Sequence, residues 1–187
     1  DGTKVYFERD RRLVMAVAVD GGEAIEVFPA AHQDWKKFQV IKPRVSADGS
    51  TVYFTTDRGG RWNAYFAEIS SGVSGHVGRG CEPTPFNSGA RAAWITKTHV
   101  LSKSGVGIFD KVSQSREKLH DLGPPLGHEY FPTLAQDDTF LLYAACPDGQ
   151  HDHLKANYQV FIRDLRSNTT VRVNHDTFTN RWPKLLK

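Results

Sequence analysis

Two histidines separated by one residue form the sharpest chemical feature of the sequence. His151 and His153 follow Pro147-Asp148-Gly149, a combination of turn-forming residues. On an extended chain alternate side chains point to the same side, so both imidazoles can bind one divalent metal ion while Asp152 points away. The further ligands would come from His128, Glu129, His175 or Asp176. The same pattern is typical of a polar, solvent-exposed hairpin loop, and both interpretations stay open.

The elements that position these residues are repeats. A proline is followed after five residues by Asp48, Ser88 or Asp137, and after six more by Phe54, Trp94 or Tyr143. Glycine follows the first two turn residues, which favours a tight turn before an apolar strand. Asp1-Gly2 opens a further copy with Phe7 at the same offset, and Trp182-Pro183 begins another. Repetition every 40 to 51 residues with strands in each copy predicts a β-propeller.

The best copy runs from Pro43 to Gly60, and a second good one from Pro132 to Asp164. These segments resemble the TolB-like β-propeller repeat, with its proline, Asp-Gly turn, apolar strand and second turn. The resemblance covers nearly the whole chain and implies radially arranged blades of four antiparallel strands. It also implies a periplasmic or extracellular location and protein binding, although one fold serves many functions.

The expected fold is thus an all-β propeller of about four blades in one domain, 1–187. The expected units are 1–37, 38–78, 79–127 and 128–180, with 181–187 as the inner strand of the next or the first unit. Lys184-Leu185-Leu186 is placed to complete the first unit by pairing with 3–8. That pairing would close the ring within one chain or in a head-to-tail dimer, and the alternative is a fragment of a larger propeller.

Charged residues near the repeated prolines form the second candidate site. In a propeller the inner strand lines the central channel, so residues beside its proline are expected at the channel mouth. These candidate binding residues are Arg44, Arg79, Glu82, His128, Glu129 and Arg181. With the nearby aromatics Tyr130, Phe131 and Trp182 they would suit a polar ligand or a peptide segment. For the aromatics, packing between blades is the favoured interpretation.

Composition narrows the classes of function. The net charge of +3 comes from 24 basic and 21 acidic residues, a balance that does not indicate nucleic-acid binding. No apolar run reaches the roughly eighteen residues that a transmembrane helix needs. The cysteines Cys81 and Cys146 fall in different units, and buried free thiols are expected.

We therefore predict a non-catalytic binding or scaffold module that uses the propeller rim or channel mouth and requires no cofactor. The alternative is a metal-dependent propeller enzyme acting on a saccharide. The repeats and the His151/His153 pair resemble oligogalacturonate lyase, whose metal is held by histidines. Gln150 does not have the spacing expected for that family's glutamine ligand, so no catalytic residue is carried over.

Overall fold

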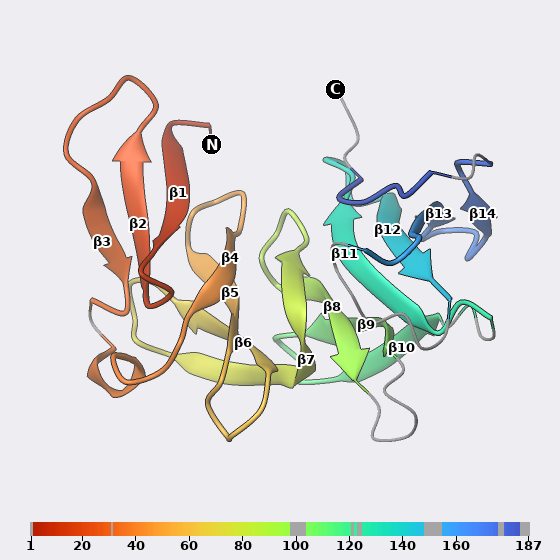
Figure 1. Cartoon of the computed structure of the whole chain (residues 1–187). Coiled ribbons are helices and arrows are strands. Elements are labelled where there is room, and N and C mark those ends of the chain that lie inside the picture. Colours follow the sequence, from red (N-terminus) through yellow and green to blue (C-terminus); the bar gives the residue numbers. More distant parts are fainter. Residues whose placement is uncertain are drawn as a thin grey trace.

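The computed structural model describes residues 2–30, 32–97, 104–120, 122, 125–147, 155–175 and 178–183. This part of the chain forms fourteen strands and one short 3-10 turn, η1 (Gln33–Trp35). Hydrogen bonds join the strands into a three-stranded and an eleven-stranded sheet, and Figure 1 shows the strands following one another along an arc. We divide them by the sequence repeat into four consecutive groups, called blades 1 to 4, and they confirm the expected all-β propeller architecture. Within the described ranges no helix is long and apolar enough to cross a membrane.

Strands next to one another within each blade pair antiparallel. Blade 1 contains β1 (Lys4–Arg9), β2 (Leu13–Ala18) and β3 (Ile25–Phe28). Blade 2 contains β4 (Ile41–Val45), β5 (Thr51–Thr56), β6 (Asn63–Glu68) and the first half of β7 (Ser74–Pro85). Blade 3 contains the second half of β7, then β8 (Arg91–Lys97), β9 (Ser104–Asp110) and β10 (Arg116–His120). Blade 4 contains β11 (His128–Leu134), β12 (Phe140–Cys146), β13 (Gln159–Asp164) and β14 (Thr170–Arg172).

Strand β7 passes from the outer position of blade 2 to the inner position of blade 3. The crossing falls at Gly80, whose φ is +133°. A Cβ atom added there would lie 1.8 Å from the carbonyl oxygen of Ile95. Only glycine therefore allows β7 and β8 to approach this closely within blade 3.

The repeated turns have the backbone conformation that their glycines predicted. The φ angles are +73° at Gly2, +73° at Gly49 and +67° at Gly89. In the fourth turn Asp138 takes the glycine position with a φ of +58°. Aspartate tolerates this left-handed region better than most residues because its short polar side chain bonds locally. The same turn thus forms before β5, β8 and β12, where the N–H of the positive-φ residue donates to the carbonyl oxygen three residues earlier.

The hydrophobic core consists of three clusters, one between each pair of successive blades. Phe54 packs against Val14 and Phe28 of blade 1, and Trp94 packs against the blade 2 cluster around Tyr53. The cluster between blades 3 and 4 contains the equivalent tyrosine of β12 and the paired residues of β8 and β9. Each repeated aromatic therefore faces the preceding blade. Its burial depends on that blade.

Phe7 shows the consequence. Phe7 has the same offset from its turn as Phe54 and Tyr143, which are 0% exposed, but it is only partly buried. No blade precedes blade 1 among the described residues, so the face that carries Phe7 is not covered in the same way. Residues 184–186, which were expected to pair with β1, lie outside the described part of the chain.

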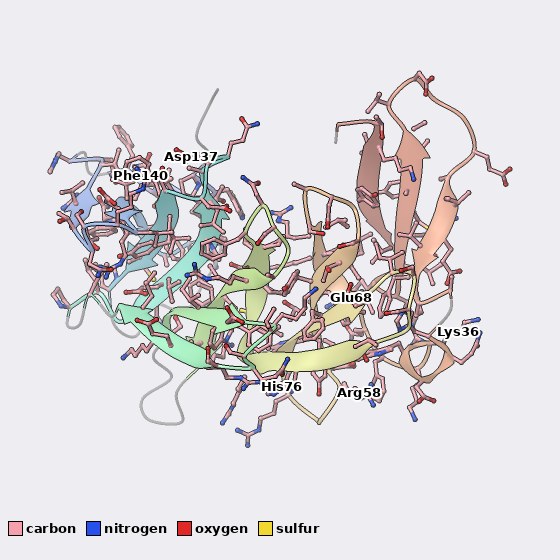
Figure 2. All side chains as sticks on the ribbon, turned by 180° about the vertical axis from the view of Figure 1, so that it is seen from behind. Lys36, Arg58, Glu68, His76, Asp137 and Phe140 are labelled. Atoms are coloured by element: carbon pink, nitrogen blue, oxygen red, sulfur yellow. The ribbon has the colours of Figure 1, made fainter. Side chains whose placement is uncertain are left out.

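Polar contacts also join neighbouring blades. The Tyr53 hydroxyl donates to the carbonyl oxygen of Gly89 at 2.7 Å, which ties β5 to the first turn of blade 3. Near the outer side, Glu68 forms an ion pair with Lys111 (Figure 2). Cys81 and Cys146 are free and buried, as expected, and burial raises the pKa of the Cys81 thiol to about 12.

Candidate functional site

The residue before each repeated proline has an unusual backbone conformation. The φ angles are +52° at Lys42, +55° at Glu82, +59° at Phe131 and +51° at Trp182. A residue before proline is normally extended, and side chains other than glycine rarely adopt positive φ. In β4, β7 and β11 the strand register shifts across this residue, which is the mark of a β-bulge. Four copies of one strained feature point to a shared role.

The bulges lie around a single cavity of about 480 Å³. Its lining comes from all four blades and from the segment after them: Tyr6–Glu8, Lys42–Arg44, Glu82–Thr84, Phe131–Thr133 and Trp182-Pro183. We call it the channel cavity. Its volume falls in the range of sites that bind small molecules or short segments of a partner.

Hydrogen bonds from the bulges join each blade to the next. The Lys42 N–H donates to Oε2 of Glu8 at 2.9 Å, and the Glu82 N–H donates to Oγ1 of Thr55 at 2.9 Å. The Phe131 N–H donates to Oε2 of Glu82 at 2.8 Å. A bulge removes its N–H from the strand ladder, and a buried donor left without an acceptor is costly. The side chain of the preceding blade supplies that acceptor.

Glu82 is the centre of this arrangement. Its side chain is 8% exposed, and its second oxygen, Oε1, forms an ion pair with the ammonium group of Lys42. The carboxylate thereby links blades 2, 3 and 4. A buried carboxylate is stable only when it is paired and hydrogen-bonded, and both conditions are met here.

Arg44 is the cation of the channel cavity that is not engaged in an ion pair with a described residue, since Lys42 is paired with Glu82. The carboxylates of Glu8 and Glu82 already accept the hydrogen bonds described above. The exposed Arg44 guanidinium forms no ion pair within the described ranges. A guanidinium presents several donors in a rigid plane and suits carboxylates and other polar acceptors.

An aromatic wall completes the cavity. The Phe131 ring lies 5.1 Å from the Trp182 ring, and 5.3 Å from the ring of Tyr158. Trp182 is nevertheless 55% exposed. The Arg181 guanidinium lies 5.2 Å from the centre of the Trp182 ring. Phe131 is therefore part of the interior, whereas Trp182 offers an apolar face to a ligand.

The structure separates the charged residues that the sequence grouped together. Arg44 and Glu82 line the channel cavity, and Arg181 adjoins it through Trp182. Arg79 lines a different cavity, described below. The candidate metal residues His151 and His153 lie outside the described residues.

His128 and Glu129 lie inside the protein. His128 is 2% exposed and Glu129 is 0% exposed. The Glu129 carboxylate accepts hydrogen bonds from the N–H groups of Val106, at 2.8 Å, and Leu122, at 2.9 Å. It thus joins blade 4 to the strand β9 of blade 3.

The described residues do not supply a metal site. Within them no group of three or more His, Cys, Asp or Glu side chains could hold a metal ion. His175 is described, but its neighbour Asp176 lies outside the described ranges.

The sequence analysis did not identify Lys42, Glu8 and Thr55, which form the hydrogen bonds and the ion pair between blades. Lys42 had a signal, because it stands at the position before a repeated proline. The other two residues follow Phe7 and Phe54, so they also recur at one offset. Because residues before proline are normally extended, the sequence did not predict the bulge whose N–H reaches these side chains.

Comparison with known proteins identifies the fold. No protein-family model matches the sequence, and no curated protein matches it. The structure is similar to TolB from Acinetobacter baumannii, with 17% identity and a TM-score of 0.72, over 96% of this chain and 42% of that one. It is also similar to a TolB from Agrobacterium tumefaciens, with 14% identity and a TM-score of 0.70, over 90% of this chain and 59% of that one.

A third similar structure is an oligogalacturonate lyase in complex with manganese. The identity is 12% and the TM-score 0.61, over 91% of this chain and 50% of that one. The chain thus has a TolB-like β-propeller fold and spans 42% to 59% of the length of these three proteins. Likeness at this level of identity concerns the fold, and the function has to be argued from the site.

Proposed function

We propose that the protein is a non-catalytic binding module whose channel cavity takes a polar segment of a partner protein or a polar small ligand. The observation that carries the proposal is the set of four positive-φ residues before proline, Lys42, Glu82, Phe131 and Trp182, on the wall of one cavity. Such strain persists where the surrounding structure enforces it, and it is common at ligand sites.

The chemistry of the cavity indicates what it would bind. Glu8 and Glu82 each accept a backbone hydrogen bond through Oε2, whereas Arg44 is exposed and lacks an ion-pair partner in the described parts of the chain. The exposed face of Trp182 lies in the same lining. A ligand with a carboxylate or other acceptor for Arg44 and an apolar group for Trp182 would satisfy both.

Cellular location and partners belong to the same proposal. Resemblance to TolB-like repeats supports a periplasmic or extracellular setting and a protein partner. A larger complex or a head-to-tail dimer is compatible with it.

The proposal is tested by selecting peptide ligands and then measuring how removal of the Arg44 charge affects their binding. A random peptide library would be panned on the immobilised chain, and the selected peptides measured by fluorescence anisotropy. Peptides that use the channel cavity should bind Arg44→Ala roughly tenfold more weakly, because a charge-assisted hydrogen bond is lost. Arg61→Ala, outside this cavity, is the matched control. Peptides that bind Arg44→Ala and the parent chain equally well would place the binding surface elsewhere.

The second candidate function is a metal-dependent enzyme acting on a saccharide through His151 and His153. The observation that favours it is the similarity in fold to an oligogalacturonate lyase that binds manganese. Its test is elemental analysis of protein purified without added metal. One divalent ion per chain, lost in His151→Ala/His153→Ala, would support this function, and absence of bound metal in the parent protein would count against it.

A further inference from the structure

A second cavity, of about 540 Å³, shares no lining residue with the channel cavity. It lies between the loop that joins β5 to β6, the end of β8 and the crossing point of β7. Its lining consists of Asp57, Gly60, Arg61, Trp62, Arg79 and Lys97. We call it the basic cavity.

Hydrogen bonds fix the loop that forms one wall. The side-chain amide of Asn63 donates to the carbonyl oxygens of Arg58 and Arg61, both at 2.9 Å. The Gly80 N–H donates to the carbonyl oxygen of Trp62 at 3.1 Å, which ties the loop to β7. Arg58 is not part of the cavity, since its guanidinium lies 4.3 Å from the centre of the Trp35 ring (Figure 2). The wall is thus formed before any ligand arrives.

The basic cavity has a net positive charge. Three cations, Arg61, Arg79 and Lys97, face a single carboxylate, and Arg79 and Lys97 are half-buried. That carboxylate, Asp57, already accepts a hydrogen bond from the Gln39 N–H at 2.9 Å. Arg61 and Lys97 form no ion pair with any residue that the structure describes. Arg61 and Lys97 therefore bring two positive charges to the cavity that no described residue pairs with.

Trp62 supplies an apolar surface beside these charges. It is half-buried and lines the same cavity. Aromatic side chains hold planar rings by stacking, while arginine holds the oxygens of phosphates in pairs. The combination suits a molecule with an anionic group at one end and a ring at the other.

We propose that the basic cavity binds a phosphate monoester that carries a planar ring, about the size of a mononucleotide. The two positive charges of Arg61 and Lys97 match the dianion of a phosphate monoester better than a monocarboxylate. The volume is in the range of sites for small ligands. This site is independent of the proposed function of the channel cavity.

Equilibrium dialysis with adenosine monophosphate as the probe tests the proposal. Adenosine monophosphate should bind with a dissociation constant below about 1 mM, and inorganic phosphate and adenosine should each bind roughly tenfold more weakly because each makes half of the contacts. Binding should also weaken as salt is added.

Substitutions in the basic cavity test the contacts of the phosphate and of the ring separately. Arg61→Ala and Lys97→Ala should each weaken adenosine monophosphate and phosphate binding roughly tenfold. Trp62→Ala should weaken the binding of adenosine monophosphate but leave the binding of inorganic phosphate unchanged. Arg166→Ala, on an exposed turn outside both cavities, is the control and should bind as the parent does. Arg61 is exposed, so its removal tests the charge without disturbing the core.

Three results would overturn the proposal. They are no binding of adenosine monophosphate at about 1 mM, binding of adenosine as tight as that of the nucleotide, and full affinity in folded Arg61→Ala and Lys97→Ala. Folding of each variant is checked by circular dichroism and thermal unfolding.

Discussion

Glu82 accepts a hydrogen bond from the backbone N–H of Phe131, with 2.8 Å between the donor nitrogen and Oε2. The two residues occupy the same place in successive blades, since each precedes a repeated proline and each has a positive φ. The contact therefore joins blade 3 to blade 4 at the wall of the channel cavity.

Removing this acceptor should destabilise the protein. Glu82→Ala leaves the buried Phe131 N–H without its acceptor, at a cost of about 1–3 kcal/mol in the free energy of unfolding. Glu82→Gln keeps an amide oxygen for that N–H and should lose less. Urea denaturation measures both. Equal stability of Glu82→Ala and the parent would show that the contact does not hold the blades together.

The packing between blades predicts different effects of two equivalent aromatics. Phe54 is 0% exposed and contacts blade 1, so Phe54→Ala should lower the free energy of unfolding by about 3–5 kcal/mol. Phe7 is only partly buried, so Phe7→Ala should cost about 1–2 kcal/mol. Denaturant unfolding of both variants tests the ranking. A loss under about 1 kcal/mol for Phe54→Ala would contradict the proposed register.

Gly80 should tolerate no side chain. In Gly80→Ala the new Cβ would meet the carbonyl oxygen of Ile95 at 1.8 Å, and two strands would have to separate. We expect a loss of more than about 3 kcal/mol, or failure to fold. Gly60→Ala is the control: φ is +80° there too, but nothing lies within 4 Å, so about 1 kcal/mol is expected. Similar thermal stabilities for the two variants would refute the close approach.

Stability in acid should depend on Asp48. A hydrogen bond from the Ser46 hydroxyl, and then one from the Ser50 N–H, hold the pKa of the Asp48 carboxyl below its ordinary value. Because the folded pKa lies below the unfolded one, the stabilisation is complete above about pH 4 and is lost as the pH falls through the folded pKa.

The difference in stability between the parent and Asp48→Asn should therefore shrink below about pH 4. Urea midpoints measured from neutral to acid pH would show it. A difference that stays constant across this range would mean that the carboxylate is not stabilised by folding.

Local patterns predicted the turns and the positions of the core aromatics. The turn glycines require positive φ, and the fixed offset from turn to aromatic puts Phe54, Trp94 and Tyr143 in one register. These features depend on a few neighbouring residues. Phe7 has the same local pattern, but its burial depends on a blade that the described chain does not place beside it.

The candidate site was harder to predict because it depends on how blades meet. Arg79 is close in sequence to Glu82, yet the crossing at Gly80 places it on a different cavity. Glu129 is close to a repeated proline, as the exposed Arg44 is, but it is buried against β9. Contacts between strands of different blades decide both outcomes, and spacing along one chain does not reveal them.

Blocking the channel cavity with a covalent label tests the central claim most directly. Thr133 lines the cavity, and the native cysteines Cys81 and Cys146 are buried, so Thr133→Cys can be labelled selectively with a bulky maleimide. Ser71→Cys, on an exposed turn, is the labelled control. A peptide or polar ligand selected on the parent chain should bind labelled Ser71→Cys normally and lose its binding to labelled Thr133→Cys. Full binding to the labelled, folded Thr133→Cys protein would contradict a ligand site in the channel.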